Sequence, residues 1–170
     1  MGVHPHPEVL LSLKLTPGQL REILGLSQDT FRHWKRSLKP LSGRNGYTPC
    51  FSPGDLFAVA AVQGLVTDAG VRVGAIAAIA DELFQFATTT SWAVIERSVL
   101  IFDLANGRIS VAQETSSLRP TGIGVHVPCR PIVARLRERL LAEQDGELQQ
   151  LLQFPPAVVA GRTGTGGEQP

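Results

Sequence analysis

The sequence has few of the features that mark a secreted, membrane-spanning or metal-binding protein. Its 170 residues include only two cysteines, Cys50 and Cys129, which are too few for a four-ligand zinc site and fit a reducing cytosol. No apolar run approaches the roughly 20 residues that a membrane-spanning helix needs, and residues 1–8 lack the layout of a signal peptide. We therefore expect a cytoplasmic protein that has no membrane partner, binds no metal and carries no cofactor.

Motifs of the common enzyme classes are also lacking. Residues 161–167 (GRTGTGG) mimic a phosphate-binding loop, but no strand is expected before them, no helix after them, and the lysine of that motif is missing. No Gly-x-Ser-x-Gly elbow and no paired-carboxylate motif occurs. The two cysteines are interpreted as small packing residues and His126 as a strand residue. The sequence thus predicts a protein without enzymatic activity.

The chain does have enough apolar sequence for a core, and its charge is uneven. Apolar residues make up 43% of a length that suits one ordinary domain or two small ones. The formal net charge is only +1, yet residues 1–50 carry seven bases and three acids, whereas residues 51–170 carry nine bases and twelve acids. The N-terminal excess of bases indicates a surface that meets an anionic partner; a solvated charged face would give the same pattern.

Four helices are expected in the N-terminal half, after a flexible leader at residues 1–12. Thr16 with Gln19, and Ser52 with Asp55, have the spacing of capping boxes, and a proline follows each capping residue. The helices are predicted at residues 17–24, 27–39, 53–67 and 72–87.

A wing hairpin is predicted between the second and third of these helices. Residues 40–51 are rich in turn-forming residues and contain Asn45-Gly46, which is the strongest short signal of a β-hairpin because both residues accept a positive φ.

The remaining sequence predicts a smaller lobe. Polar residues 88–91 mark a boundary, and residues 155–170 are expected to be a disordered tail. Between them we expect strands at 92–97, 99–104, 108–113 and 122–127. A last helix should begin at Pro131 and be interrupted at Asp145-Gly146. One side of that helix is apolar and suited to a partner subunit; it comprises Ile132, Val133, Leu136 and Leu140.

The second helix combines two faces of different chemistry. Phe31, Trp34 and Leu38 recur at i, i+3 and i+7, so they share a face that should pack on the first helix. Another face carries four bases, Arg32, Lys35, Arg36 and Lys39. An apolar face that fixes the helix and a cationic face that reaches phosphates and guanine edges are typical of a helix-turn-helix recognition helix. A solvated amphipathic helix is the alternative.

The N-terminal half resembles the MerR family of winged-helix regulators. Residues 15–20 (LTPGQL) resemble the family's first helix, and residues 25–36 (GLSQDTFRHWKR) resemble its recognition element. Residues 44–47 (RNGY) and 51–56 (FSPGDL) are similar to its wing and the start of its third helix. The resemblance covers residues 13 to about 86 and does not extend into the second half of the chain.

This resemblance implies a set of DNA-contacting residues. Arg32 and Arg36 would contact DNA from the helix. Tyr47, with Arg44 beside it, would contact the DNA backbone from the wing. Alternatively, the Tyr47 ring would pack the wing against Trp34. The full predicted DNA-binding set is Ser27, Gln28, Thr30, Arg32, His33, Lys35, Arg36, Lys39, Arg44, Asn45 and Tyr47.

Together these features predict an α+β fold. A winged helix-turn-helix domain of four helices and a wing hairpin should occupy residues 13–87. A strand-rich lobe with a C-terminal helix should follow at 92–154, and this lobe would dimerise the protein or sense a signal. The predicted function is sequence-specific binding of double-stranded DNA in bacterial or phage transcription regulation. The protein would be a nucleoid-associated homodimer that joins through 92–154, with residues 27–39 in the major groove and 40–51 on the backbone.

Two alternatives remain open. One is an excisionase-like or other phage or plasmid architectural DNA-binding factor. The other is a protein-interaction adaptor or antitoxin whose strand-rich lobe is the working surface. An unidentified protein or a small-molecule effector is a further possible partner.

Overall fold

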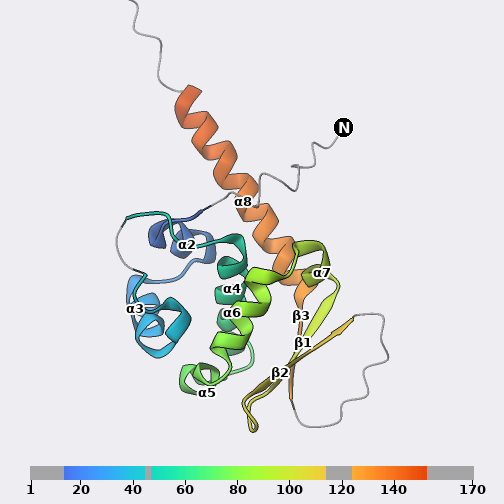
Figure 1. Cartoon of the computed structure of the whole chain (residues 1–170). Helices are drawn as coiled ribbons and strands as arrows, with labels where there is room; N and C mark the ends of the chain where they lie inside the picture. The colour runs from blue at the N-terminus through green and yellow to red at the C-terminus, as the bar shows by residue number, and fades with distance from the viewer. Residues whose placement is uncertain (1–13, 45–46, 114–123, 153–170) are drawn as a thin grey trace, which may run out of the picture.

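The computed structural model describes residues 14–44, 47–113 and 124–152, with side chains described as far as residue 142. The predicted leader, the predicted tail and Asn45 lie outside the described residues. The described part confirms an α+β fold, in which helices pack beside a small antiparallel sheet (Figure 1). Its elements are α2 (Pro17–Leu24), α3 (Gln28–Ser37), the 3-10 helix η1 (Lys39–Leu41), α4 (Pro53–Thr67), α5 (Val73–Ala77), α6 (Ala80–Thr89), α7 (Trp92–Glu96), β1 (Ser98–Asp103), β2 (Arg108–Gln113), β3 (Val125–Pro128) and α8 (Cys129–Leu152).

Both predicted capping boxes are present. The Gln19 amide donates to the Thr16 hydroxyl (3.2 Å), and the Thr16 amide donates to the Gln19 side chain (2.9 Å). Ser52 and Asp55 form the same reciprocal pair at the start of α4, with bonds of 3.1 and 2.8 Å. Each box gives partners to amides that lack them in the first turn of a helix, which fixes where α2 and α4 begin.

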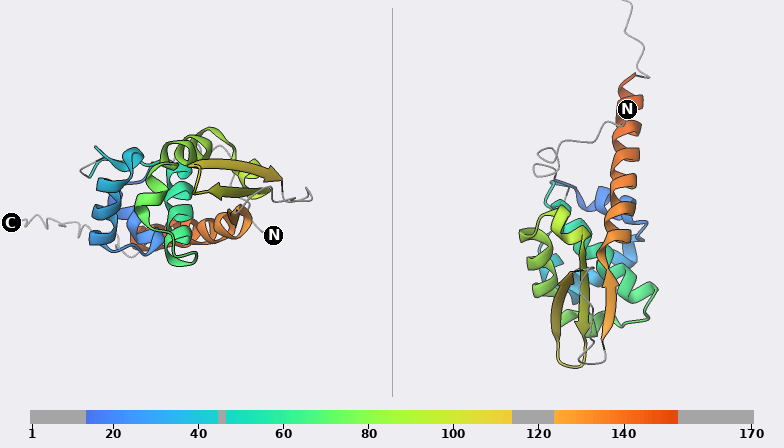
Figure 2. Two further views of the ribbon diagram at one scale, coloured as in Figure 1. Left: turned by 90° about the horizontal axis from the view of Figure 1, so that it is seen from below. Right: turned by 90° about the vertical axis from the view of Figure 1, so that its right-hand side faces the viewer.

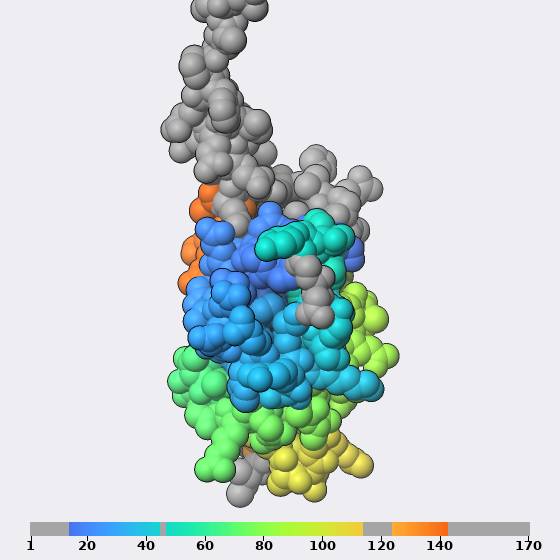
Figure 3. All heavy atoms as spheres, turned by 90° about the vertical axis from the view of Figure 1, so that its left-hand side faces the viewer, coloured from blue at the N-terminus to red at the C-terminus, as the bar shows by residue number. Residues whose placement is uncertain are grey.

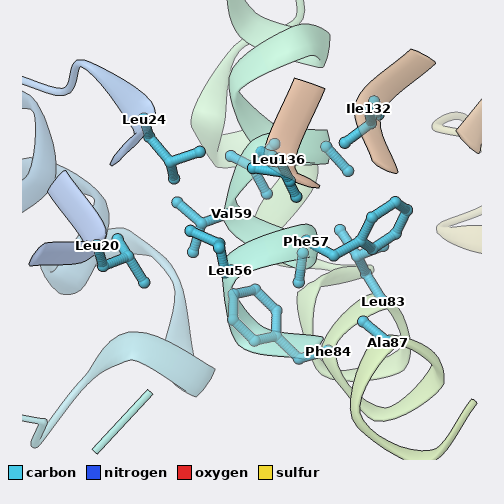
Figure 4. Packing of buried hydrophobic residues seen from close by; sticks show 14 of the residues in the cluster. Leu20, Leu24, Leu56, Phe57, Val59, Leu83, Phe84, Ala87, Ile132 and Leu136 are labelled. Atoms are coloured by element: carbon cyan, nitrogen blue, oxygen red, sulfur yellow. The ribbon is translucent and has the colours of Figure 1, made fainter. Parts of the chain in front are cut away.

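Helix α4 forms the centre of the molecule. Eleven of its fifteen residues are buried, which is typical of a helix enclosed by others and not of a surface helix with one apolar face. In Figure 4, Leu20 and Leu24 of α2 lie on one side of α4, and Ile132 and Leu136 of α8 lie on another. Helix α6 packs along a further side.

The sheet has three antiparallel strands in the order β2-β1-β3. β1 is the central strand, and its Leu100 and Phe102 are fully buried. The turn into β2 is closed by Asp103, which accepts bonds from the Asn106 amide (3.1 Å) and side chain (2.7 Å); these bonds lower the pKa of Asp103. Gly107 adopts the positive φ (61°) that the turn requires. The predicted hairpin of 99–104 and 108–113 is confirmed. The third strand, predicted at 122–127, is β3 at Val125–Pro128, and the right-hand view of Figure 2 shows the three strands together.

The core continues across residues 88–91. Buried side chains of α2, α4 and α6 form one cluster with those of β1 and α8. The apolar side of α8 belongs to this cluster, because α8 packs on α4 and α7 of its own chain. The prediction that this side forms a surface for a partner subunit is therefore wrong for its four residues, Ile132, Val133, Leu136 and Leu140, all of which are buried.

The wing hairpin predicted at residues 40–51 is not seen among the residues that the structure describes. Leu41 of η1 is fully buried, which turns the chain inward directly after α3. At the other end of the segment, the Leu15 amide donates to the Phe51 carbonyl (2.8 Å). Phe51 thus pairs with a residue that precedes α2 and not with residues 40–44. The prediction of a wing hairpin is therefore not confirmed: Asn-Gly signals a turn but does not show which strands flank it, and residues 45–46 themselves lie outside the described residues.

Three further predicted elements differ from the structure. The helix expected at 72–87 is two helices, because the chain turns at Ala78 and Ile79, so that α5 contacts α3 while α6 lies along α4. The strand expected at 92–97 is instead helix α7, which covers Trp92–Glu96 and packs on α8 with Ile95 buried. Helix α8 begins at Cys129 and continues through residues 145–146, because aspartate and glycine weaken a helix without breaking it.

Replacing either of two glycines of α4 by alanine should have opposite effects on the stability of the fold. A Cβ atom at Gly54 would lie 2.3 Å from the Ala87 carbonyl oxygen of α6, whereas at Gly64 the nearest atom would be 3.7 Å away. Gly54→Ala must force α6 away from α4 and should destabilise the fold by about 1–3 kcal/mol or more. Gly64→Ala should stabilise it by about 0.5–1 kcal/mol, because alanine favours helices. Urea unfolding measures both; an unchanged midpoint for Gly54→Ala would contradict the close contact.

Only one of the two thiols is expected to react in the native protein. Cys129 is buried, and burial raises the pKa of its thiol to about 11, whereas Cys50 is half-buried. Because the thiolate is the nucleophile, iodoacetamide at about pH 8 should modify Cys50 and spare Cys129. Peptide mass spectrometry reads both sites, and both should react in guanidinium chloride. Modification of Cys129 without denaturant would show that the start of α8 is misplaced.

Candidate nucleic-acid interface

Helices α2 and α3 are joined by a tight turn. Gly25 ends α2 in the left-handed region (φ 64°), and the Leu26 amide donates to the Arg21 carbonyl (2.9 Å). Ser27 then caps α3 by accepting a bond from the Thr30 amide (3.1 Å), and the two hydroxyls are bonded to each other (2.8 Å). A turn of this kind, with glycine at the end of the first helix, is typical of a helix-turn-helix. Two predicted DNA-binding residues, Ser27 and Thr30, thus hold the start of α3.

One face of α3 is buried in the core, as its periodicity predicts. Phe31, Trp34 and Leu38 are all buried, with Trp34 only 2% exposed. The Phe31 ring meets the Phe51 ring edge-on, with centroids 6.1 Å apart, a favoured geometry for aromatic pairs. This packing fixes the rotation of α3 about its axis, and so determines which side chains face solvent.

The opposite side of α3 is exposed and mainly basic. Gln28, Arg32, His33 and Arg36 are exposed, whereas Lys35 is partly buried and interacts with other residues. Arg36 has no ion-pair partner within the described ranges 14–44, 47–113 and 124–142. Figure 3 shows α2, α3, the segment after α3 and α5 together on one face of the molecule.

Two of the predicted bases pair with exposed acids. Arg32 Nη1 lies 3.2 Å from Asp29 Oδ1, and Lys39 Nζ lies 3.2 Å from Asp81 Oδ2 of α6. Exposed pairs of this kind contribute only about 0.2–1 kcal/mol each, so a phosphate can replace either acid. Lys39 itself belongs to η1, beyond the last residue of α3.

Arg44 is part of a network that anchors the segment after α3. Its Nη1 lies 2.9 Å from Asp55 Oδ2, and its guanidinium stands over the Phe51 ring, 5.2 Å from the centroid. Asp55 is only 3% exposed, and the same carboxylate oxygen accepts bonds of 2.8 Å from the amide and the hydroxyl of Ser52. The sequence predicted the capping role of Asp55. It gave no signal for the pairing with Arg44, which lies eleven positions earlier in a segment without regular structure.

Tyr47 lies on the surface and not against Trp34. Its side chain is 98% exposed, so the alternative in which the ring packs on Trp34 is wrong. A tyrosine hydroxyl on an exposed side chain can donate a hydrogen bond to a phosphate group.

The described residues offer little for other kinds of site. They contain no group of three histidine, cysteine, aspartate or glutamate side chains that could hold a metal ion. Among the same residues, no helix combines the length and the apolar character needed to cross a bilayer. The exposed face of α3 is therefore the candidate site.

Comparisons of the chain with protein-family models, with curated proteins and with solved structures found no match.

Replacing Trp34 and Arg36 should separate the two faces of α3. Trp34→Ala removes a buried aromatic side chain and should cost about 3–5 kcal/mol of stability. Arg36→Ala changes an exposed residue and should alter stability by less than about 0.5 kcal/mol. Thermal unfolding followed by circular dichroism measures both. If Trp34→Ala left the melting temperature unchanged, Trp34 would lie on the solvent side of α3.

Proposed function

We propose that the protein binds double-stranded DNA sequence-specifically and regulates transcription, with α3 in the major groove. The observation that carries this proposal is the division of α3 into a face buried by Phe31 and Trp34 and a face that exposes Arg32 and Arg36. A helix held this way presents long cationic side chains at a fixed angle. Arginine can bond the O6 and N7 atoms of guanine with both ends of its guanidinium.

The segment after α3 would contact the DNA backbone. It lies on the same face as α3 (Figure 3), and it exposes Tyr47. The Asp55 carboxylate holds Arg44, and thereby this segment, on the start of α4. Arg44 thus supports the interface by placing the segment, and we assign the backbone contact to Tyr47.

Two copies would act together on DNA. A single module of this size buries about 600–1,000 Å² of protein surface on DNA, which gives weak binding. A homodimer that reads two half-sites would bind DNA more tightly than one copy, and its DNA site would be an inverted repeat. Association with DNA would place the protein in the nucleoid.

One observation favours a protein-interaction module as the second candidate. Arg32, Lys39 and Arg44 each pair with an acid of the same chain, which reduces the positive potential around α3. The salt dependence of binding separates the two functions. A DNA-binding protein that neutralises several phosphates loses affinity for DNA steeply as the salt concentration rises. An adaptor does not bind DNA at any salt concentration.

Arg36→Ala should weaken DNA binding while the fold persists. Loss of a guanine contact costs about 1–3 kcal/mol and relaxes specificity at one base pair. The matched control is Arg97→Ala: Arg97 is also exposed, but it follows α7, far from α3 (Figure 1). Fluorescence anisotropy with a duplex selected by the wild-type protein measures both affinities. Equal affinities for the two variants would show that α3 is not the recognition helix.

A further inference from the structure

The last carbonyl groups of α2 are bonded in two different ways. A helix leaves the carbonyls of its last four residues without partners inside the helix, and in α2 these belong to residues 21–24. The carbonyls of residues 21 and 22 accept bonds from the Leu26 and Gly25 amides (2.9 and 3.1 Å), which belong to the turn that follows. No backbone amide of the described residues donates to the carbonyls of Ile23 and Leu24. Their partners come from elsewhere in the chain.

Side chains of α4 and α8 supply these two bonds. The Gln63 side chain donates to the Leu24 carbonyl (3.1 Å), and the Arg139 guanidinium donates to the Ile23 carbonyl. The two donors lie 39 and 116 positions further along the chain than the carbonyls that they bind. Figure 1 shows α8 passing close to α2, and the two helices are in contact. A guanidinium at this end of α2 also meets the negative end of the helix dipole.

These two carbonyls directly precede the turn that leads into α3. Only residues 25–27 separate α2 from α3, and Gly25 and Ser27 cap the helices on either side of the turn. A connection of three residues leaves little slack, because consecutive Cα atoms are held about 3.8 Å apart. The position of the end of α2 therefore limits where α3 can begin.

We propose that Gln63 and Arg139 are positioning residues for the candidate recognition helix. Each acts through a carbonyl of α2 and not by contact with DNA. Loss of either bond should loosen the last turn of α2, and with it the start of α3, because a carbonyl left without its partner is unfavourable. This inference deepens the proposed function and rests on it where DNA binding is concerned, but the placement of the turn can be measured without DNA.

Amide hydrogen exchange, followed by NMR on the free full-length protein, measures how firmly the turn is held. In Arg139→Met the amides of Gly25 and Leu26 should exchange about tenfold faster than in the wild type, because a charge-assisted bond is lost while an unbranched side chain is kept. Gln63→Met loses an uncharged donor and should show a smaller acceleration of about threefold. The Thr90 amide, which closes the end of α6 with a bond of 3.0 Å, should keep its wild-type rate in both variants.

Two further variants distinguish a specific bond from a general effect of charge. Arg139→Lys keeps a cationic donor and should restore most of the wild-type protection of the turn. Arg135→Met removes the same charge from the same helix, but Arg135 is exposed and has no ion-pair partner among the described side chains. It should leave the turn unchanged.

DNA binding then shows whether the turn places α3. With a duplex selected by the wild-type protein, Arg139→Met should bind about tenfold more weakly, because a displaced α3 loses base contacts. Arg135→Met should bind nearly as the wild type does. Fluorescence anisotropy measures both affinities.

Unchanged exchange at Gly25 and Leu26 in Arg139→Met would overturn the proposal. So would an equal acceleration at Thr90, which would indicate that the whole fold is destabilised, or equal effects of Arg139→Met and either Arg139→Lys or Arg135→Met. A loosened turn with wild-type affinity for DNA would also overturn it. If the exchange pattern is as expected but the wild-type protein binds no DNA, the proposed function fails and the role of the two side chains in holding the turn stands.

Discussion

The packing of helices around the buried helix α4 positions the other elements of the fold. Helix α4 packs on α6 and α8, and its Gln63 side chain donates to the Leu24 carbonyl of α2 (3.1 Å). Each of these elements is therefore positioned by its contact with the same central helix. Gly54 lets α4 approach the backbone of α6 closely, and the Asp55 carboxylate at the same end holds Ser52 and Arg44. The start of α4 therefore joins the core to the segment that follows the candidate recognition helix.

The sequence predicted the local features of the fold and missed those set by distant contacts. The capping residues Thr16 and Ser52 and the periodicity of α3 act within one or two helical turns, so a single sequence shows them. The pairing of Phe51 with Leu15 and the contact of Arg44 with Asp55 join residues that no local pattern relates. These contacts explain why the residues described on either side of Asn45-Gly46 do not pair as a wing hairpin.

The same limit applies to the candidate site. The periodicity of α3 correctly predicted which side of the helix is buried, because the burial of Phe31 and Trp34 follows from their spacing. It could not show that Arg32 and Lys39 pair with acids of the same chain, nor that the apolar side of α8 is used in the protomer's own core. Arg36, by contrast, is exposed and has no ion-pair partner among the described side chains.

We propose that α3 reads the sequence of double-stranded DNA. Selection of bound duplexes from a random pool, with the full-length protein at low salt, tests it most directly. We expect enrichment of an inverted repeat whose half-sites lie about 10 base pairs apart, or a multiple of that spacing, because two recognition helices would then lie on one side of the duplex. A pool without any enriched sequence would contradict it.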